Sequence, residues 1–426
     1  MNERVIKVVF DIGNKRIKGL VGAHSPQCDR MEVLSYAETE SSGIKRSSVY
    51  DVESLSNSIK TVLDELRDDT GLEINSVSIS VGGHNIKSST VFNQIEFEEK
   101  TITKEDLERF FKQAAEKVFE DEGHNKYRIL YKETYNMKVN NGNIIKDPIG
   151  KQGKSLQANV HIVYIDEAEV EQYVEAINML GVEVSGIYLK PYMANMGTLN
   201  GKNTQLGVVL VDIGYESTDV ILIKNSKAIY VKSIPVGEYH FISDLHHMLN
   251  TSMELAKGIF EEYKKNYVYG THGTDSKKIR YENLSASVET INKIIKMRTQ
   301  DISNFVNESI NDSGFTGILN ELVFTGGGVY VPGIVEIISK DCGYSAKKQP
   351  TIQIKGLKEV NSNMSVVVGN FIYETYKDYL EFEEKNKLKT MNSYEDRIQE
   401  LDEDDDEDEE TESGFSKLIN FLKNFF

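Results

Sequence analysis

Two stretches of the chain share one pattern of apolar and polar positions. In each, an apolar run ends in Asp-Ile-Gly, a short polar turn follows, and a second apolar run returns, over residues 8–22 and 208–223. Short apolar runs bounded by turn residues are typical of buried β-strands. Because the same strand-turn-strand unit recurs about 200 residues later, the pattern predicts a duplicated fold with two similar lobes.

A third apolar segment, residues 322–334, leads through Thr325 into three consecutive glycines and then into a helix-like pattern that begins near Ile334. Glycines let the backbone pass close to a flat ligand or to its phosphate groups. Taken alone, this segment is as typical of a tight strand-to-helix turn without a ligand. Because it follows the two strand-turn-strand units, it favours a nucleotide-binding function for all three segments.

Residues 104–119 have the period of an amphipathic helix. Thr103 and Asp106 have the spacing of an N-terminal cap. One face of the predicted helix carries the apolar residues Leu107, Phe111, Ala114, Ala115 and Val118. We interpret this helix as core packing without chemistry.

Composition narrows the class of protein. The 426 residues are too many for one core, so two or more domains are expected. Hydrophobic residues make up 39% and charged residues 27%, as in soluble globular proteins, and there is no apolar run of about 18 residues to span a membrane. The apolar run at residues 5–10 is too short for a signal peptide, and Cys28 and Cys342 provide neither a disulfide framework nor metal-ligand spacing. A cytoplasmic protein is predicted.

The net charge of −18 is concentrated near the C-terminus, where residues 402–412 contribute ten negative charges. The surrounding segment, residues 381–413, has almost no apolar residues, which predicts a disordered acidic linker. The rest of the chain has no basic stripe and no interleaving of aromatic and basic residues. No nucleic-acid partner is therefore expected.

The last thirteen residues, 414–426, form an amphipathic pattern after this linker. Lys417 and Lys423 belong to the polar face. The other face of the predicted helix carries Phe415, Leu418, Ile419, Leu422, Phe425 and Phe426. Aromatic and aliphatic residues opposite lysines are typical of a helix that lies on a membrane surface. Docking on the protein's own core and binding in a partner's groove are the alternatives.

The order of the three glycine-containing segments resembles the actin-like ATPase superfamily, and further stretches are similar to the bacterial FtsA family of cell-division proteins. The resemblance covers roughly residues 4–375 and the extreme C-terminus. It is carried by residues 76–89, by 233–245 and, most distinctively, by YRILYKETYNMKVNNGNIIKDPIGKQGKSLQANVHIV at 127–163. The pilus protein PilM has a related insert and is an alternative, as is a phosphotransferase or carbohydrate kinase of the same superfamily.

The resemblance implies an α/β, actin-like (ribonuclease H-like) fold of two lobes with an inserted small α+β subdomain of SHS2 type. The implied boundaries are 1–83 and 166–199 for lobe one, 84–165 for the insert, 200–236 and 303–380 for lobe two, 237–302 for a subdomain of lobe two, 381–413 for the linker and 414–426 for the membrane-targeting helix. It also implies a function. The protein would polymerise like actin at the cytoplasmic face of the inner membrane, at the division septum. There it would tether the tubulin-like protein FtsZ through residues 237–302 and meet other division proteins.

The resemblance further implies a site for ATP and Mg²⁺. The metal is assigned to Asp11, which would orient it through water, and to Asp212. The nucleotide would contact Gly13, Asn14, Lys15, Lys18, Gly214, Tyr215, Glu216, Ser217, Thr218, Gly237, Lys257, Phe260, Gly326, Gly327, Gly328 and Tyr330.

Three departures from the family pattern predict a weakened site. Tyr215 and Glu216 replace two glycines, and a carboxylate beside a γ-phosphate is repulsive unless Mg²⁺ lies between them. The charges near Lys257 are displaced relative to relatives. Lys190 stands before Pro191 where many relatives carry the Glu that polarises water, and a protonated lysine cannot act as a general base. We therefore expect nucleotide binding with little or no turnover, and we assign no catalytic residue.

Overall fold

The computed structural model describes residues 4–25, 28–120, 126–199, 204, 207–270 and 277–398. The predicted amphipathic helix at 414–426 and the acidic run at 402–412 lie outside the described residues. Among the helices that are described, none has the length and low charge that crossing a lipid bilayer requires.

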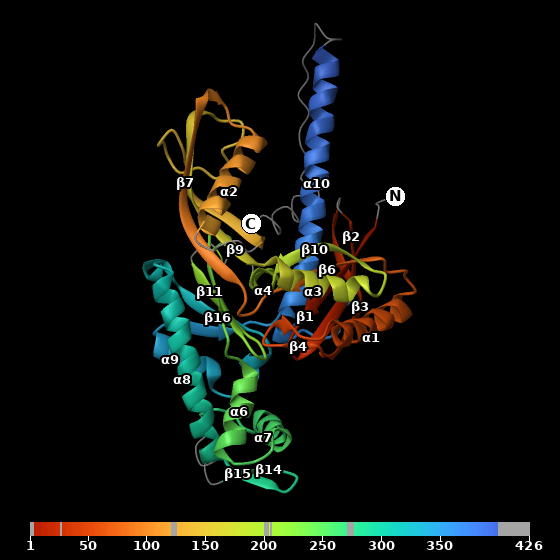
Figure 1. Ribbon diagram of the computed structural model, residues 1–426, viewed down its shortest axis with the longest axis vertical. Coiled ribbons are helices and arrows are strands. Elements are labelled where there is room, and N and C mark those ends of the chain that lie inside the picture. The colour runs from red at the N-terminus through yellow and green to blue at the C-terminus, as the bar shows by residue number, and fades with distance from the viewer. Residues whose placement is uncertain are drawn as a thin grey trace.

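Two five-stranded sheets form the two lobes, and they have the same topology (Figure 1). In each sheet, an antiparallel meander of three strands continues into two further strands in parallel pairing. In spatial order, the lobe-one strands are β10 (Glu183–Leu189), β6 (Ser76–Val81), β1 (Val5–Ile12), β2 (Arg16–Ser25) and β3 (Cys28–Glu40). The lobe-two strands are β17 (Ser345–Lys348), β16 (Glu321–Thr325), β11 (Val208–Ile213), β12 (Thr218–Lys224) and β13 (Lys227–Ile234). The duplication predicted from the repeated Asp-Ile-Gly pattern is therefore present in the fold.

The equivalence of the lobes extends to the register of single residues. In lobe one, Asp11 pairs with Lys18 across the β1–β2 hairpin. In lobe two, Asp212 pairs with Asp219 at the same distance from the turn. Each turn is closed by the glycine that follows Asp-Ile, whose N–H donates to a carbonyl three residues later. The two Asp-Ile-Gly motifs thus place matching side chains on matching strands.

Helices cover both sheets and also lie between them. α1 (Val52–Thr70) and α3 (Glu167–Asn178) pack on the outer face of lobe one, and α8 (Val288–Asp312) and α9 (Ile334–Cys342) pack on lobe two. Between the lobes, α4 (Lys190–Thr198) and α10 (Ser365–Ile398) share one hydrophobic core with both sheets. This shared core includes the fully buried Val9 of lobe one and Leu210 of lobe two. The two lobes are therefore joined by packed helices rather than by a loose linker.

Two glycines let α4 and α10 cross at close range. A Cβ atom on Gly197 of α4 would lie 1.9 Å from the carbonyl oxygen of Ser365. A Cβ atom on Gly369 of α10 would lie 1.8 Å from the carbonyl oxygen of Met193. No side chain fits at either position, so the spacing of these helices depends on both glycines.

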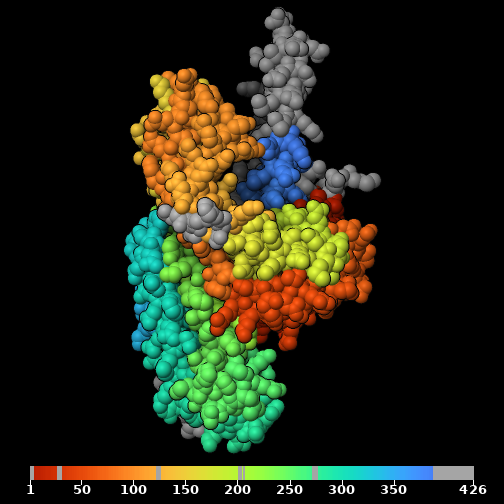
Figure 2. All heavy atoms as spheres, in the orientation of Figure 1, coloured from red at the N-terminus to blue at the C-terminus, as the bar shows by residue number. Residues whose placement is uncertain are grey.

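The insert is a three-stranded antiparallel sheet with one helix packed on it, and it projects from the top of the molecule (Figure 2). Its strands, in spatial order, are β7 (Lys87–Thr101), β9 (Gln152–Asp166) and β8 (Tyr127–Val139), and its helix is α2 (Lys104–Phe119). The predicted N-terminal cap is confirmed, because Thr103 and Asp106 form a reciprocal capping box.

The predicted apolar face of α2 packs on the core of the insert, but the prediction omitted Phe110. Phe110 is fully buried, whereas Phe111 and Leu107 are only partly buried at the edge of the insert's core. The buried stripe runs through Asp106, Phe110, Ala114 and Val118, each one turn from the next. The stripe that faces the sheet therefore begins at Asp106, a residue of the capping box.

The lobe-two subdomain forms the opposite end of the molecule (Figure 1). It contains α6 (Glu238–Met248), α7 (Met253–Asn266) and the hairpin of β14 (Lys278–Tyr281) and β15 (Leu284–Ser287), and it packs on the N-terminal half of α8. A second small hairpin, β4 (Ile44–Lys45) and β5 (Ser48–Val49), belongs to lobe one.

The start of the predicted linker differs from our expectation. α10 ends at Ile398, so residues 381–398, which we expected to be disordered, are helical. The first half of this stretch is rich in Glu and Lys, which have high helix propensity and attract each other at a spacing of one turn. Low apolar content alone was therefore a poor guide to disorder here.

Candidate functional site

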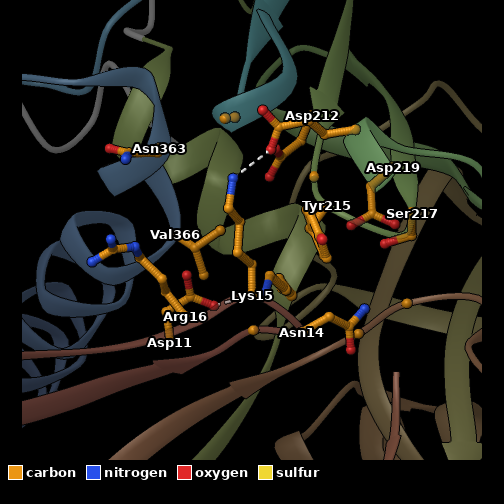
Figure 3. A pocket seen from close by; sticks show the side chains of 18 of the residues that line it. Asp11, Asn14, Lys15, Arg16, Asp212, Tyr215, Ser217, Asp219, Asn363 and Val366 are labelled. Carbon is orange, nitrogen blue, oxygen red and sulfur yellow. Dashed lines mark hydrogen bonds and ion pairs between the residues drawn. The ribbon is translucent and has the colours of Figure 1, made fainter. Parts of the chain in front are cut away.

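A pocket opens between the two lobes where their equivalent hairpins face each other (Figure 3). Its walls are the β1–β2 turn, the β11–β12 turn and the glycine loop after β16. The structure brings most of the predicted site residues into this one pocket: Asp11, Gly13, Asn14, Lys15, Lys18, Asp212, Gly214, Tyr215, Ser217, Gly326, Gly327 and Tyr330. Segments far apart in the sequence thus meet as the order of the motifs predicts.

Four of the predicted residues support the pocket from behind instead of lining it. Thr218 is fully buried, and its hydroxyl donates to the Val236 carbonyl oxygen at 2.7 Å. Gly237 lies against the β11–β12 turn, and a Cβ there would lie 2.7 Å from the Gly214 carbonyl oxygen. Gly328 packs on Ile213, and Phe260 is fully buried in the lobe-two core. We expected these four to contact the nucleotide, and for this the structure gives no support.

Glu216 does not line the pocket either. A carboxylate oxygen of Glu216 accepts a hydrogen bond from the backbone N–H of Arg46 at 2.7 Å. Arg46 belongs to the β4–β5 hairpin of lobe one, so this contact joins the two lobes at the edge of the cleft. Of the two residues that we expected to weaken the site, only Tyr215 lines the pocket, whereas Glu216 lies at its edge.

The charged contact on α7 lies two turns beyond the predicted one. Lys257 is exposed and does not line the pocket, whereas Lys264 does. Both lie on one face of α7 because seven residues make about two helical turns. The ammonium of Lys264 pairs with Glu238 and lies 3.1 Å from a carboxylate oxygen of Glu261. Lys264, with Glu261 beside it, is therefore the charged residue of α7 that reaches the pocket.

Asp11 is held between two lysines. Its Oδ1 atom lies 2.7 Å from the Nζ of Lys190, and its Oδ2 atom lies 3.5 Å from the Nζ of Lys18. Lys18 also donates to the backbone carbonyl of Asn363. Burial acts to raise the pKa of Asp11, but the two ammonium groups outweigh burial and hold that pKa below its usual range. Asp11 is therefore ionised, and the ammonium groups of Lys190 and Lys18 balance its negative charge.

Lys190 carries a full positive charge in the floor of the pocket. Burial acts to lower its pKa, but the carboxylates of Asp11, Asp212 and Asp219 raise it above the usual value for lysine. A group that stays protonated cannot accept the proton of an attacking water. Lys190 therefore cannot serve as a general base.

Two further carboxylates face this lysine from lobe two. Burial and the neighbouring Asp219 raise the pKa of Asp212 to about 7. Burial likewise raises the pKa of Asp219. Asp219 was missed in the sequence, although a signal existed, because it follows Asp212 by seven residues as Lys18 follows Asp11.

The residues of this cluster do not fit the Mg²⁺ site that we expected. Mg²⁺ prefers a near-octahedral shell of oxygen ligands. Mg²⁺ at a nucleotide site takes most of these ligands from water and from substrate phosphates, so the question is whether Asp11 and Asp212 are free to serve it. Both oxygens of Asp11 face ammonium groups, and an ammonium repels a divalent cation. The expectation that Asp11 and Asp212 serve a metal is therefore not supported by the donor set.

The pocket as a whole suits an anion. Five cationic side chains line it, against four carboxylates, and the raised pKa of Asp212 removes part of the negative charge near pH 7. The cations are Lys15, Arg16, Lys18, Lys190 and Lys264. Gly327 in the glycine loop has open space where a side chain would be, so a ligand can approach its backbone closely.

Two family models match the chain. The model described as "SHS2 domain inserted in FTSA" matches residues 83–164, and the model described as "Cell division protein FtsA" matches residues 209–370. Together they cover more than half of the chain, and they fall on the three-stranded insert and on most of lobe two.

Relatives match along most of the chain. The cell division protein FtsA of Helicobacter pylori strain 26695 is 25% identical over 412 residues, which cover 88% of this chain and 82% of the relative. FtsA of Borreliella burgdorferi is 24% identical, covering 92% of this chain and 94% of the relative. FtsA of Bacillus subtilis is 24% identical, covering 79% and 77%.

Solved structures share the fold at low sequence identity. The PilM-PilN type IV pilus biogenesis complex matches with a TM-score of 0.62 and 13% identity, covering 88% of this chain and 99% of the other. MreB 5 of Spiroplasma citri bound to AMPPNP matches with a TM-score of 0.51 and 13% identity, covering 89% and 99%. These two likenesses establish an actin-like fold and nothing about function.

Proposed function

The chain belongs to the FtsA family of cell-division proteins, and we propose that it acts as an actin-like scaffold that binds a nucleotide and links the division machinery to the membrane. The observation that carries this proposal is the insert. A three-stranded sheet with one helix stands between β6 and α3 of an actin-like body, and the family model for the FtsA insert matches it. The family also places the protein at the division site.

The nucleotide part of the proposal rests on the cleft between the lobes. Two equivalent hairpins and a glycine loop meet there, and five cationic side chains line the pocket. The actin-like MreB 5 of Spiroplasma citri was crystallised with AMPPNP, so this fold is able to hold an adenine nucleotide in another protein. We propose ATP as the ligand here, bound with little or no turnover because Lys190 stands where a general base would be needed.

The membrane and partner parts of the proposal rest on sequence pattern and family. The amphipathic pattern at residues 414–426 would place the chain at the inner face of the cell membrane. The subdomain at 237–302 would bind FtsZ, and head-to-tail contacts through the insert would build open filaments. Weak binding by single amphipathic helices would become firm when a filament presents many of them together.

A reconstitution tests the proposal. The full chain would be mixed with vesicles of phosphatidylethanolamine and phosphatidylglycerol, with ATP and with FtsZ from the same organism. We expect both proteins to float with the vesicles and the membrane-bound protein to form filaments under the electron microscope. A chain that stays in the soluble fraction and never assembles contradicts the scaffold function.

Phosphate release measured in the same mixture separates the scaffold from an enzyme of the same superfamily. We expect turnover far below the value of roughly 10 s⁻¹ that is the median for enzymes. Turnover at that level, on ATP alone or with a carbohydrate acceptor, would favour the phosphotransferase alternative. Flotation with a pilus assembly partner instead of FtsZ would favour the alternative of a PilM-like scaffold.

A further inference from the structure

We infer that the ammonium group of Lys190 takes the place of a divalent cation in this cleft, so that the protein binds nucleoside di- and triphosphates without Mg²⁺. This inference deepens the proposed nucleotide binding and rests on it. It depends on the lysine at the start of α4 and on the carboxylates near it.

The position of Lys190 is the first argument. It is the first residue of α4, directly before Pro191, and its Cβ atom lies 2.7 Å from where a side chain on Gly82 would begin. The stem of the lysine is thus confined by the end of β6. Its Nζ atom lies 2.7 Å from Asp11 Oδ1 and 3.6 Å from where a side chain on Gly13 would begin. The charge therefore lies beside the β1–β2 turn, at Asp11.

The surrounding carboxylates are the second argument. Asp11 comes from β1, and Asp212 and Asp219 come from β11 and β12 of the other lobe. All three lie close enough to favour the charged form of Lys190. A buried ammonium is stable only when carboxylates surround it, and here the two lobes together provide them. Asp11 contacts Lys190 directly, and the charges of Asp212 and Asp219 act on it from the other lobe.

The remaining cations are the third argument. A divalent cation beside Asp11 would lie next to both Lys190 and Lys18, and like charges at that range repel strongly in a pocket with little water. The side chains of the pocket carry more cations than carboxylates without any metal. A nucleotide that is free of Mg²⁺ carries more negative charge than its Mg²⁺ complex, so it is the better match for this set of groups.

The test compares nucleotide binding with and without the metal. Isothermal titration of the full chain with ADP and with AMPPNP would be run once in excess Mg²⁺ and once in EDTA. We expect the dissociation constant in EDTA to lie within about threefold of the constant in Mg²⁺. Binding that is lost or weakened more than about tenfold in EDTA would show that Lys190 moves aside for a metal, and it would overturn the inference while the proposed nucleotide binding stands.

Substitutions of Lys190 test whether its charge is responsible for binding without Mg²⁺. Lys190→Glu converts the cluster into four carboxylates, so binding in EDTA should weaken by at least about tenfold and Mg²⁺ should restore it. Lys190→Met removes the charge without adding a ligand, so it should weaken binding in both buffers. The matched control is Lys293→Glu on α8, because Lys293 is exposed and lies outside the pocket. This control should bind as the parent does in both buffers.

Two outcomes for the parent chain decide the matter even if Lys190→Glu fails to fold. Equal binding in both buffers supports the inference without any variant. Absence of binding in both buffers overturns the inference together with the proposed nucleotide function. A Lys190→Glu protein that folds and still binds equally well in EDTA also overturns the inference, because the charge of Lys190 would then contribute nothing.

Discussion

The ammonium of Lys15 lies 2.9 Å from a carboxylate oxygen of Glu238, and this ion pair crosses the cleft from lobe one to lobe two. Glu238 is almost fully buried at the start of α6, and it also pairs with Lys264 of α7. The Nζ of Lys15 lies 5.1 Å from the centre of the Tyr215 ring, which belongs to the β11–β12 turn. One carboxylate therefore joins the β1–β2 turn to the lobe-two subdomain.

We predict that Glu238→Gln destabilises the protein more than Lys15→Met does. The first change leaves two ammonium groups without their buried carboxylate, whereas the second leaves the pair of Glu238 and Lys264 intact. The free energy of unfolding should fall by on the order of 2–3 kcal/mol for Glu238→Gln and by less than about 1 kcal/mol for Lys15→Met, whose side chain is partly exposed. Urea unfolding measures both, and the reverse order would contradict the prediction.

The ion pairs of Glu238 also predict that the free energy of unfolding depends on pH. Burial acts to raise the pKa of Glu238, but Lys264 and Lys15 outweigh it and hold the pKa below the usual value of 4.5. The stabilisation is therefore fully present above the usual pKa of glutamate, and it is lost as the pH falls through the lowered pKa. The difference in stability between the parent and Glu238→Gln should be constant near pH 7 and should shrink below pH 4.5.

We predict that Gly369→Ala is strongly destabilising. The added methyl group would lie 1.8 Å from the carbonyl oxygen of Met193, so α4 and α10 would have to separate. Overpacking of this kind typically costs about 1–3 kcal/mol. The matched control is Gly317→Ala in the short helix Thr316–Ile318, where an added methyl meets open space and stability should be unchanged or slightly higher. Equal urea midpoints for the two variants would contradict the close crossing.

We predict that Asp212→Asn raises the melting temperature in mildly alkaline buffer. The pKa of Asp212 is raised to about 7 from the usual 3.8, so the folded protein binds a proton more tightly than the unfolded chain does. The contribution of Asp212 to the free energy of unfolding is fully present below the usual pKa of aspartate. It is lost as the pH rises through the raised pKa of the folded protein. At pH 8 the parent carries the cost of a buried anion and the asparagine variant does not. The gain should shrink towards pH 5, and a gain that grows on acidification would contradict the raised pKa.

We predict that the double change Leu418→Glu and Leu422→Glu abolishes binding to vesicles. Both leucines belong to the predicted apolar face of residues 414–426, and full burial of one such side chain is worth roughly 1.5–3 kcal/mol. The matched control is Asn420→Glu with Asn424→Glu, which adds the same charge on the polar face and should retain binding to neutral vesicles. Undiminished flotation of the double leucine variant would favour a partner groove or docking on the chain itself.

Replacing Lys417 and Lys423 of the same helix by Gln should weaken binding on anionic vesicles in particular. Each lysine near an anionic surface contributes about 1 kcal/mol. Binding to neutral vesicles should change little, because the apolar face is intact. An equal loss on both kinds of vesicle would indicate that the lysines serve folding or a partner instead.

We predict that the insert provides a filament contact. Phe92 of β7 is 56% exposed, and Phe92→Asp should reduce filament length or abolish filaments in electron micrographs. Deletion of residues 84–165 should abolish them altogether. The matched control is Met179→Asp at the end of α3, because Met179 is also 56% exposed but belongs to lobe one. Filaments that survive both changes at the insert would contradict its role in assembly.

Local patterns in the sequence were sufficient for the duplicated framework. The two Asp-Ile-Gly hairpins, the glycine loop and the capping box of Thr103 were all predictable, because each depends on residues within one turn or one hairpin. Short-range hydrogen bonds and alternating burial require particular residues at fixed spacings. This residue pattern is the same wherever the element lies in the fold. Asp219 could also have been predicted, because the register of the hairpin pairs it with Asp212.

The chemistry of the cleft was decided only by the tertiary structure. The contacts of Lys190 with Asp11 and of Lys15 with Glu238 join residues that are far apart in the sequence, and they depend on how α4 and α10 hold the two lobes together. The same holds for Lys264 in place of Lys257 on α7, since both lie on one helical face and only the position of the helix determines which one reaches the pocket. Charge pairing acts over a few ångströms in space, whereas a sequence pattern records neighbours along the chain, so these partners became visible only when the lobes were brought together.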